Sequence, residues 1–261
     1  DLKKWHRNFR EMLKRGDADK LDHKWGRYPP QCRFNVDQSP APFAMNLKET
    51  YTDVDDQHVH LASAGHCGLD KRQCTLQLVF SPDLPADRQP KPGIIFRGKG
   101  TRIPRSETEA YHPDVHVYWQ PKAWVDRPTA VKWAGDFKKD LAQKSFPDEK
   151  DAVDCCLLMD NLDAQWQKPY LAELKKVVKN KKKKSIRVFP WFHLADSTDL
   201  SQAVDAGYAA EIKVEMARKQ DEWMDTPENL DKWCSGELTA GDRRILLTHW
   251  LGEAVEVVHS K

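Results

Sequence analysis

The sequence predicts a mixed α/β fold, in which one sheet carries helices on its faces. Two observations predict it. Short apolar or alternating runs of strand length recur along the chain, and longer segments with apolar residues every three or four positions stand between them. The clearest run is "DAVDCCLLMD", because a continuous apolar stretch bounded by polar residues is typical of a strand buried on both faces.

The first half of the chain is predicted to hold a helix followed by strands. Trp5 and Phe9 belong to an apolar stripe that predicts a helix over residues 1–22, and "GRYPPQ" ends it. Phe34 and Val36 alternate with polar residues, as in a strand. "GHCGLDKR" is predicted to be the turn of a hairpin. The predicted strands are, in order, "CRFNVDQS", "HVHLASA", "QCTLQLVFS" and "KPGIIFRGKG".

The second half is predicted to be mainly helical around two strands. A helix is predicted after Pro128, with Trp133 and Phe137 on its apolar face. Thr226 and Thr239 are the predicted caps of the last two helices. After the strand that ends before Asp160, the predicted elements are a helix in "YLAELKKVVKN", a strand in "SIRVFPWF", and helices in "DLSQAVDAGYAAEIKVEMARKQ", "TPENLDKWC" and "TAGDRRILLTHWLGEAVEVV".

Composition indicates a globular, intracellular, soluble protein. Of the 261 residues 39% are hydrophobic, and 42 basic side chains nearly balance 40 acidic ones, so net charge does not identify a partner. No apolar run has the length of a membrane helix, and the first residues do not resemble a secretory signal. The six cysteines include no CxxC pair, which favours reduced thiols. One segment gathers residue types that bind zinc, but their spacing is not that of a zinc finger, so a zinc site is not favoured. These residues are His58, His60, His66, Cys67 and Cys74.

Three aspartates are candidate metal ligands. Asp160 follows the buried strand, at the carboxyl end where ligands gather in open α/β sheets. Asp37 lies in the first strand and Asp205 in a later helical segment, and carboxylates from such separate elements suit a site for two divalent ions. Because both end or interrupt apolar strand patterns, we expect Asp37 and Asp160 on adjacent strands of one mixed sheet. Spacing alone does not show that the three aspartates converge. The alternative is that Asp160 or Asp163 caps the helix that follows it.

Around these residues the sequence resembles the DDE-superfamily endonucleases of the pogo/Tigger transposons, which are related to the mariner group and to centromere protein B. "FNVDQSP" around Asp37 resembles the first motif of that family. "LLMDNLDAQ" around Asp160 resembles the second, and "DSTDLSQAVDAG" with Asp205 resembles the third. Three motifs in order are more specific than any one of them.

The resemblance implies an RNase H-like mixed sheet flanked by helices, with a helical C-terminal tail. It implies a transposase-type DNA endonuclease and strand transferase, in which Asp37, Asp160 and Asp205 hold two Mg²⁺ or Mn²⁺ ions. Double-stranded DNA of transposon ends is the expected substrate, a homodimer the expected assembly and the nucleus the expected location. The expected organisation is a helical linker from a missing N-terminal DNA-binding region (1–27), a catalytic domain (28–220) and a helical extension (221–261).

Departures from the family pattern leave alternatives open. Gln165 stands where histidine is common, Ala203 replaces a usual proline, and "FPWFHLAD" lacks the expected proline-rich turn. One alternative is a domesticated, transposase-derived DNA-binding or scaffold protein with an inactive metal site. Another is a ribonuclease or exonuclease on the same fold.

Basic segments are candidate DNA contacts. Arg97, Lys99 and Arg102 surround two glycines that would let the backbone approach a phosphate, although an exposed loop with solvated charges is an equal alternative. Asn161 contacts a phosphate, orients Asp160 or, as an equal alternative, caps the next helix. The lysine-rich residues 175–184 are expected to form a surface helix end and loop, remote from the carboxylates. Most of the tryptophans are expected in the core.

Overall fold

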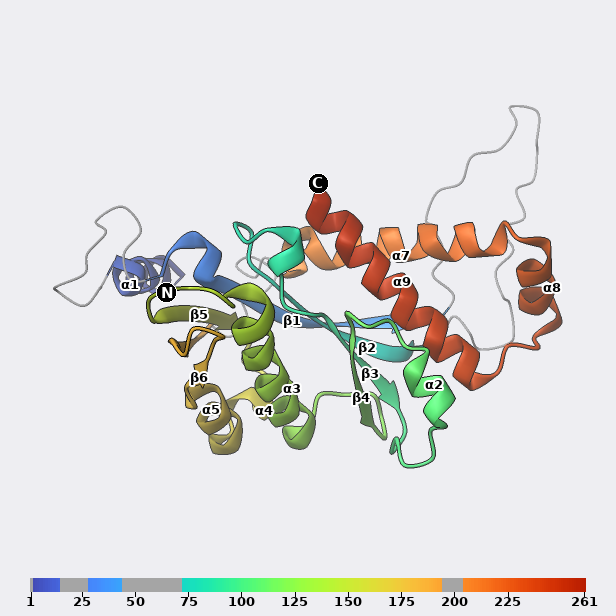
Figure 1. The fold of residues 1–261 in the computed structure, drawn as a ribbon, viewed down its shortest axis with the longest axis horizontal. Helices are drawn as coiled ribbons and strands as arrows, with labels where there is room; N and C mark the ends of the chain where they lie inside the picture. The colour runs from blue at the N-terminus through green and yellow to red at the C-terminus, as the bar shows by residue number, and fades with distance from the viewer. Residues whose placement is uncertain (1, 15–27, 44–71, 194–203) are drawn as a thin grey trace. The chain divides into compact units, whose positions relative to one another are not determined.

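The structure, a computed structural model, describes residues 2–14, 28–43, 72–193 and 204–261, and its strands form one mixed sheet (Figure 1). The sheet order is β4-β3-β2-β1-β5-β7-β6. β1 pairs in parallel with β5 and β5 with β7, whereas β6 is antiparallel to β7. The strands are β1 (Arg33–Pro42), β2 (Arg72–Phe80), β3 (Gly93–Arg97), β4 (His116–Gln120), β5 (Val153–Met159), β6 (Val178–Lys179) and β7 (Ser185–Phe192).

Helices flank this sheet and form the C-terminal tail. They are α1 (Leu2–Lys14), α2 (Arg105–Glu109), α3 (Arg127–Asp140), α4 (Asp163–Trp166), α5 (Lys168–Lys175), α7 (Ala209–Met224), α8 (Pro227–Ser235) and α9 (Ala240–Ser260). On one side of the central strand β1 lie β2, β3 and β4, which follow it in the chain. On the other side lie β5 and β7, and β5 pairs in parallel with both β1 and β7. The predicted class, an RNase H-like mixed sheet with flanking helices and a helical tail, is therefore confirmed.

The chain divides into two compact units, each built from segments far apart in sequence. Unit 1 comprises residues 1–38, 77–93 and 125–209, and unit 2 comprises residues 39–76, 94–124 and 210–261. Helix α7 runs through residue 220, where the sequence places a domain boundary. The domain limits 27/28 and 220/221 stay predictions.

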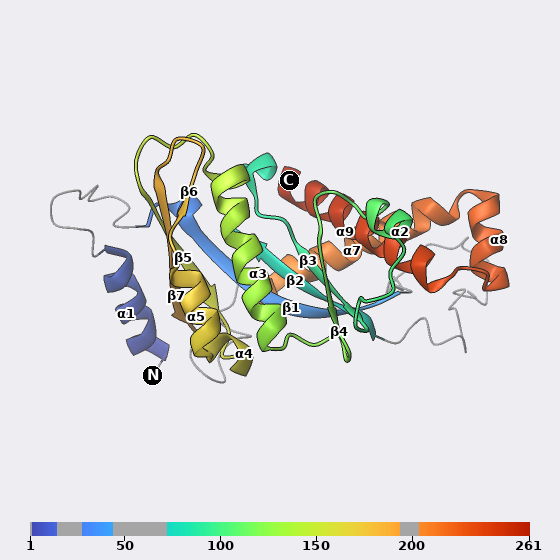
Figure 2. The same cartoon turned by 60° about the horizontal axis from the view of Figure 1, so that its bottom comes forward.

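In unit 1, α3 covers one face of the strands. Figure 2 shows α3 and α5 side by side next to β5 and β7. Phe34 of β1 meets Phe137 of α3 edge to face, with ring centroids 5.5 Å apart, and Phe137 stacks on Trp133. Asp126 caps α3 by accepting a hydrogen bond from the Thr129 N–H at 3.0 Å. The aromatic stripe predicted for this helix is thus its buried face.

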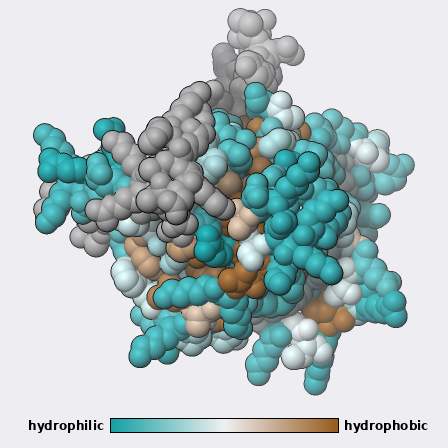
Figure 3. Space-filling model, turned by 60° about the vertical axis from the view of Figure 1, so that its left-hand side comes forward, coloured by the Kyte–Doolittle hydropathy of each residue, from teal (hydrophilic) through white to brown (hydrophobic). Residues whose placement is uncertain are grey.

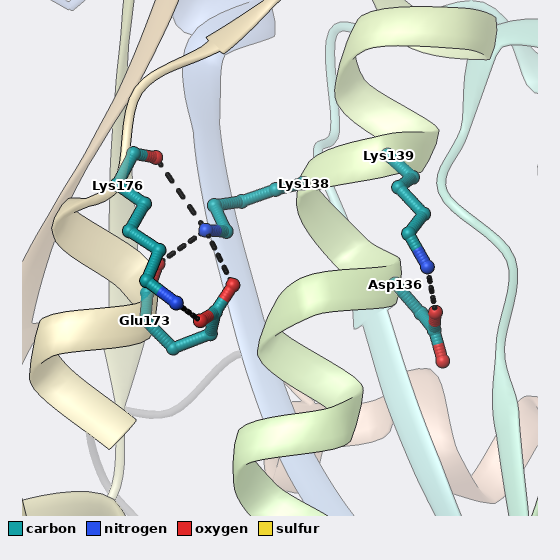
Figure 4. A network of polar contacts seen from close by, with 5 residues as sticks. All are labelled: Asp136, Lys138, Lys139, Glu173 and Lys176. Atoms are coloured by element: carbon teal, nitrogen blue, oxygen red, sulfur yellow. Dashed lines mark hydrogen bonds and ion pairs between the residues drawn. The ribbon is translucent and has the colours of Figure 1, made fainter. Parts of the chain in front are cut away.

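A buried lysine ties α3 to α5 (Figure 4). Lys138 is 2% exposed, and its ammonium donates to Glu173 Oε1 at 2.8 Å and to the backbone carbonyls of Glu173 and Lys176. Hydrogen bonds from Lys138 and Lys176 hold the pKa of the Glu173 carboxyl below its usual value. The buried charge is therefore both paired and hydrogen-bonded, the condition under which burial of a charge is tolerated.

The lysine-rich segment differs from its prediction. The helix predicted in "YLAELKKVVKN" ends at Lys175, and Val178–Lys179 form β6, with Val178 paired to Ile186 of β7. Asn180 shapes the turn, because its Oδ1 accepts hydrogen bonds from the backbone N–H groups of Lys182 and Lys184 at 3.0 and 2.9 Å. The segment is a hairpin, since pairing with β7 outweighs the helical propensity of the lysines.

Other predicted elements agree more closely. Residues 2–14 are helical as predicted, and Thr239 caps α9 in a capping box with Asp242. Thr226 is the N-cap of α8 without a side-chain hydrogen bond. The sequence did not predict β4. The predicted strand "HVHLASA", the turn "GHCGLDKR" and the histidines 58, 60 and 66 lie outside the described residues.

None of the helices in the described part of the chain combines the length and apolar character needed to cross a membrane.

Candidate active site

Asp37 lies on β1 of unit 1, and Asp160 directly follows β5, the parallel neighbour of β1. In the β1–β5 pairing Val36 is opposite Met159, and the two aspartates are the next residue on each strand. β5 ends at Met159, so Asp160 begins the loop, whereas β1 continues to Pro42. The prediction that the two aspartates lie on adjacent strands of one sheet is confirmed.

The two faces of β1 have different surroundings. Phe34 faces the aromatic side chains of α3, and side chains alternate along a strand, so Asn35 and Asp37 lie on the opposite face. Asp37 is only 7% exposed. The alternating sequence predicts a strand with one solvated face, but the middle of β1 is buried on both faces. Polar side chains buried in this way need partners, and the hydrogen bonds of Asn35 supply part of the local framework.

Asn35 links the three segments that carry the aspartates. Its Nδ2 donates to the backbone carbonyl of Leu158 at 3.4 Å, two residues before Asp160. Its Oδ1 accepts from the backbone N–H of Val204 at 2.9 Å, one residue before Asp205. Asp205 lies in the short π-helical turn Val204–Tyr208, of which the structure describes the backbone at this position. The Asn35 side chain therefore joins β1, the end of β5 and the backbone directly before Asp205.

His193 follows β7 at the same edge and is 3% exposed. Its backbone N–H donates to the carbonyl of Met159 at 2.9 Å, and its Nε2 lies 3.5 Å from Asn35 Nδ2. Asn161 Nδ2 donates to the His193 carbonyl at 2.7 Å, so Asn161 joins the loop after β5 to the end of β7. Its predicted contact with DNA stays a prediction.

The capping interpretation of the aspartates is wrong. Helix α4 begins at Asp163, its N-cap is Leu162, and no side chain caps it. Asp160 lies two residues before that N-cap. A carboxylate at this place therefore has no helix to cap.

Aromatic side chains close one side of the edge. The Trp5 indole of α1 donates to the Phe192 carbonyl at 2.9 Å and stacks on His193 at a centroid distance of 5.3 Å. Trp166 stacks on Phe192 at 3.9 Å and is 50% exposed, so it departs from the expected core position. On the side of the molecule that carries α1, small apolar patches lie among mostly hydrophilic side chains (Figure 3). Trp5 shields His193 from water.

Sequence reasoning missed Asn35 and His193. Asn35 reads as a solvent-facing residue of an alternating strand, and its partners are 123, 158 and 169 residues away in sequence. The segment "FPWFHLAD" drew attention only for a missing proline-rich turn. The available signal was the position of His193 directly after an apolar strand, the same signal that identified Asp160.

The donors at this edge fit a hard divalent cation. Asp37 and Asp160 offer carboxylate oxygens, which Mg²⁺ and Mn²⁺ prefer. Among the side chains that the structure describes, no group of three or more His, Cys, Asp or Glu is close enough to hold a metal ion. The Asp205 side chain is not among them. The joint binding of metal by Asp37, Asp160 and Asp205 stays a prediction.

The basic loop after β3 belongs to unit 2, where Arg97, Lys99 and Arg102 are exposed. Gly100 has φ +66°, and a Cβ there would lie 2.5 Å from the Trp119 indole. Close packing on Trp119 therefore requires a glycine at position 100. This packing accounts for the glycine without any need for the backbone to approach a phosphate. The binding of DNA by the three basic residues stays a prediction.

Comparisons with known proteins give a distant likeness only. No protein-family model and no curated protein sequence matches the chain. It is similar to the Mos1 transposase paired-end complex with left transposon end, at 14% identity and a TM-score of 0.41, over 97% of this chain and 68% of that one. The Mos1 mariner paired-end complex with Mn is 16% identical with a TM-score of 0.43, over 88% of this chain and 56% of that one. A pre-cleavage Mos1 transpososome is 14% identical with a TM-score of 0.46, over 98% of this chain and 58% of that one. The chain thus spans little more than half of the last two, and such values do not determine a function.

Proposed function

We propose that the chain is a transposase-type, metal-dependent DNA endonuclease that also transfers strands. The observation that carries the proposal is the register of β1 and β5, in which Asp37 and Asp160 follow directly on the paired residues Val36 and Met159. The hydrogen bond from Val204 to Asn35 supports the third position, because it holds the backbone before Asp205 at the same edge.

In this proposal Asp37, Asp160 and Asp205 hold Mg²⁺ or Mn²⁺. The chemistry that two such ions supply is activation of a water or a 3′-hydroxyl and neutralisation of the leaving oxygen of a phosphodiester. Asn35 keeps the three segments together through hydrogen bonds to Leu158 and Val204. Because these bonds are to backbone atoms, they position the aspartates without using the carboxylate oxygens.

The wider assignments rest on the motif resemblance. Double-stranded DNA of transposon ends is the proposed substrate, and a homodimer in the nucleus is the proposed working form. The three similar structures are a Mos1 transposase paired-end complex with left transposon end, a Mos1 mariner paired-end complex with Mn and a pre-cleavage Mos1 transpososome.

The test is nicking of a supercoiled plasmid by the full chain with Mn²⁺, with and without chelator. Asp160→Asn keeps the size of the side chain and removes the negative charge, so nicking should fall by about a thousandfold or more. Asp163→Asn is the matched control, because Asp163 is exposed and pairs with Arg127.

Equal nicking by the parent and Asp160→Asn proteins would refute the site. Metal-independent nicking would refute the mechanism. DNA binding without nicking by any of the proteins would favour the alternative, a transposase-derived DNA-binding or scaffold protein with an idle site.

A further inference from the structure

Unit 2 contains an arginine-lined pocket that the proposed active site does not use. Its volume is about 220 Å³, and three of its six lining residues are basic while none is acidic. Arg97 ends β3, and Arg243 and Arg244 are consecutive residues of α9. The apolar part of the lining comprises Phe96, Ala240 and Leu247. Apolar walls exclude water and so strengthen any charge interaction inside the pocket.

Arg244 is held in one orientation. Its Nε and Nη2 donate to Glu107 Oε1 and Oε2 at 2.7 and 3.0 Å, and its guanidinium lies 5.2 Å from the centre of the Trp119 ring. Glu107 is 8% exposed and also accepts from the Tyr111 hydroxyl at 2.6 Å. The fork to Glu107 uses two of the five guanidinium N–H donors. A guanidinium fixed in this way loses little entropy when it binds a ligand.

The charges around Arg244 leave the pocket positive. The hydrogen bond from Arg244 lowers the pKa of Glu107, and Glu107 in turn raises the pKa of Arg244, so both are ionised at neutral pH. Burial and Glu107 raise the pKa of Tyr111, which remains a neutral donor. The Arg244–Glu107 pair is electrically balanced. Arg97 and Arg243 therefore supply the excess positive charge.

The position of the two arginines near the start of α9 adds to the positive charge of the pocket. Arg243 and Arg244 are the fourth and fifth residues of the 21-residue helix. The amino-terminal end of a helix carries partial positive charge, which repels guanidinium groups. Asp242 is engaged in the capping box, where its carboxylate accepts from the Thr239 backbone N–H at 2.9 Å. A bound anion would relieve the repulsion that remains.

We propose that Arg97, Arg243 and Arg244 form a binding site for a phosphate group. Guanidinium donors from two elements suit the several oxygens of a tetrahedral phosphate, which arginine binds through paired hydrogen bonds. DNA as the source of the phosphate rests on the proposed function; a free phosphate or a phosphorylated small molecule is the other source of the same chemistry. The site would then bind the DNA backbone and contribute affinity without sequence preference.

The test variant is Arg97→Ala/Arg243→Ala. Arg97 is exposed and the Arg243 guanidinium lies 6.0 Å from the ring centre of Phe43, so neither change strands a buried charge, whereas Arg244→Ala would strand Glu107. The matched control is Arg105→Ala/Arg218→Ala, which removes two arginines from the same unit outside the pocket.

The first measurement is binding of a random-sequence DNA duplex by the full chain in EDTA, over a range of salt concentrations. The pocket variant should bind about tenfold more weakly, and its salt slope should be lower by about one unit, because one phosphate fewer is neutralised. The control should keep the slope of the parent. EDTA makes this result independent of nicking, so failure of the pocket and failure of the proposed active site are distinguished.

The second measurement is the rise of Tm with inorganic phosphate, against chloride at equal ionic strength. The parent and the control should be stabilised, and the pocket variant should not. A change in the DNA measurement assigns the phosphate to DNA. A change with inorganic phosphate alone assigns it to a small phosphate-bearing ligand. If the pocket variant matches the control in both measurements, the proposal is overturned.

Discussion

Asn35 and Asn180 are equally buried, each 6% exposed, and lie near opposite ends of β5 and β7. Asn180 makes four side-chain hydrogen bonds, all to backbone groups no more than 34 residues away in sequence. The partners of Asn35 are 123 or more residues away. The same buried amide thus builds a turn at one end of these strands and holds distant segments together at the other.

Removal of a carboxylate charge should have a large effect on nicking near the carboxyl end of β5 and almost none near its amino end. Asp37→Asn should lower the rate of Mn²⁺-dependent nicking by about a thousandfold, which corresponds to about 4 kcal/mol of barrier. Asp154→Asn, at the other end of β5, removes the ion pair with Arg187 at 2.6 Å and should leave the rate within about twofold. The measurement is initial nicking rate. Similar reductions in both variants would break the comparison.

The asparagines themselves give the next effect. Asn35→Ala and Asn180→Ala should each lower the free energy of unfolding by about 2 kcal/mol, because each leaves buried backbone groups unpaired. Only Asn35→Ala should accelerate hydrogen exchange at the Val204 amide, which loses its acceptor. Urea unfolding and amide exchange measure the two quantities. An unchanged exchange rate at the Val204 amide would show that Asn35 does not hold this segment in place.

Acid should lower the stability of the Asn35→Ala and Asn180→Ala variants to the same extent. The pKa of Glu173 is below its usual value of 4.5 because of hydrogen bonds from Lys138 and Lys176. Its contribution to stability is therefore complete above about pH 4.5 and is lost as pH falls through the lower folded value. Unfolding followed by Tm against pH should show this loss in the parent and in both asparagine variants. Glu173→Gln should flatten it, and a steeper loss in Asn35→Ala alone would reveal an acid-sensitive partner of Asn35.

The smallest expected effect concerns the lysines beside Asn180. Residues 181–184 are exposed and lie at the start of β7, whereas Asp160 follows the end of β5, so the two are at opposite ends of these strands. Replacing the four lysines with glutamine should lower the salt slope of DNA binding by about one unit for each phosphate that is no longer neutralised, and should leave nicking chemistry unchanged. A slope equal to that of the parent would mean a merely solvated hairpin.

The elements that sequence predicted are those with a strong local pattern. The apolar run of β5 and the cap at Thr239 are visible in a few neighbouring residues, and both are confirmed. β4 was missed because "HVYWQ" is short and its polar and apolar residues do not alternate. β6 was missed because its two residues pair with β7 and have no pattern of their own.

The candidate site was predictable only in part. Asp37 lies within an alternating strand pattern and Asp160 directly follows an apolar one. Their position on neighbouring strands was predicted from these two patterns. The role of Asn35 was not predictable, since its partners lie on β5, directly after β7 and at the start of the turn that contains Asp205. Long-range hydrogen bonds of a single amide leave no periodic trace in a sequence.

The pairing of β1 with β5 also sets an order of assembly. Their paired residues lie 123 positions apart, as Arg33 and Cys156 do, and closing so long a loop is slow compared with local helix formation. During synthesis β1 is available long before β5, so its unpaired edge is open to other chains. Asp37 and the buried polar residues beside it interrupt the apolar character of that edge. The same residues that mark the candidate site would thus protect the nascent chain from aggregation until β5 arrives.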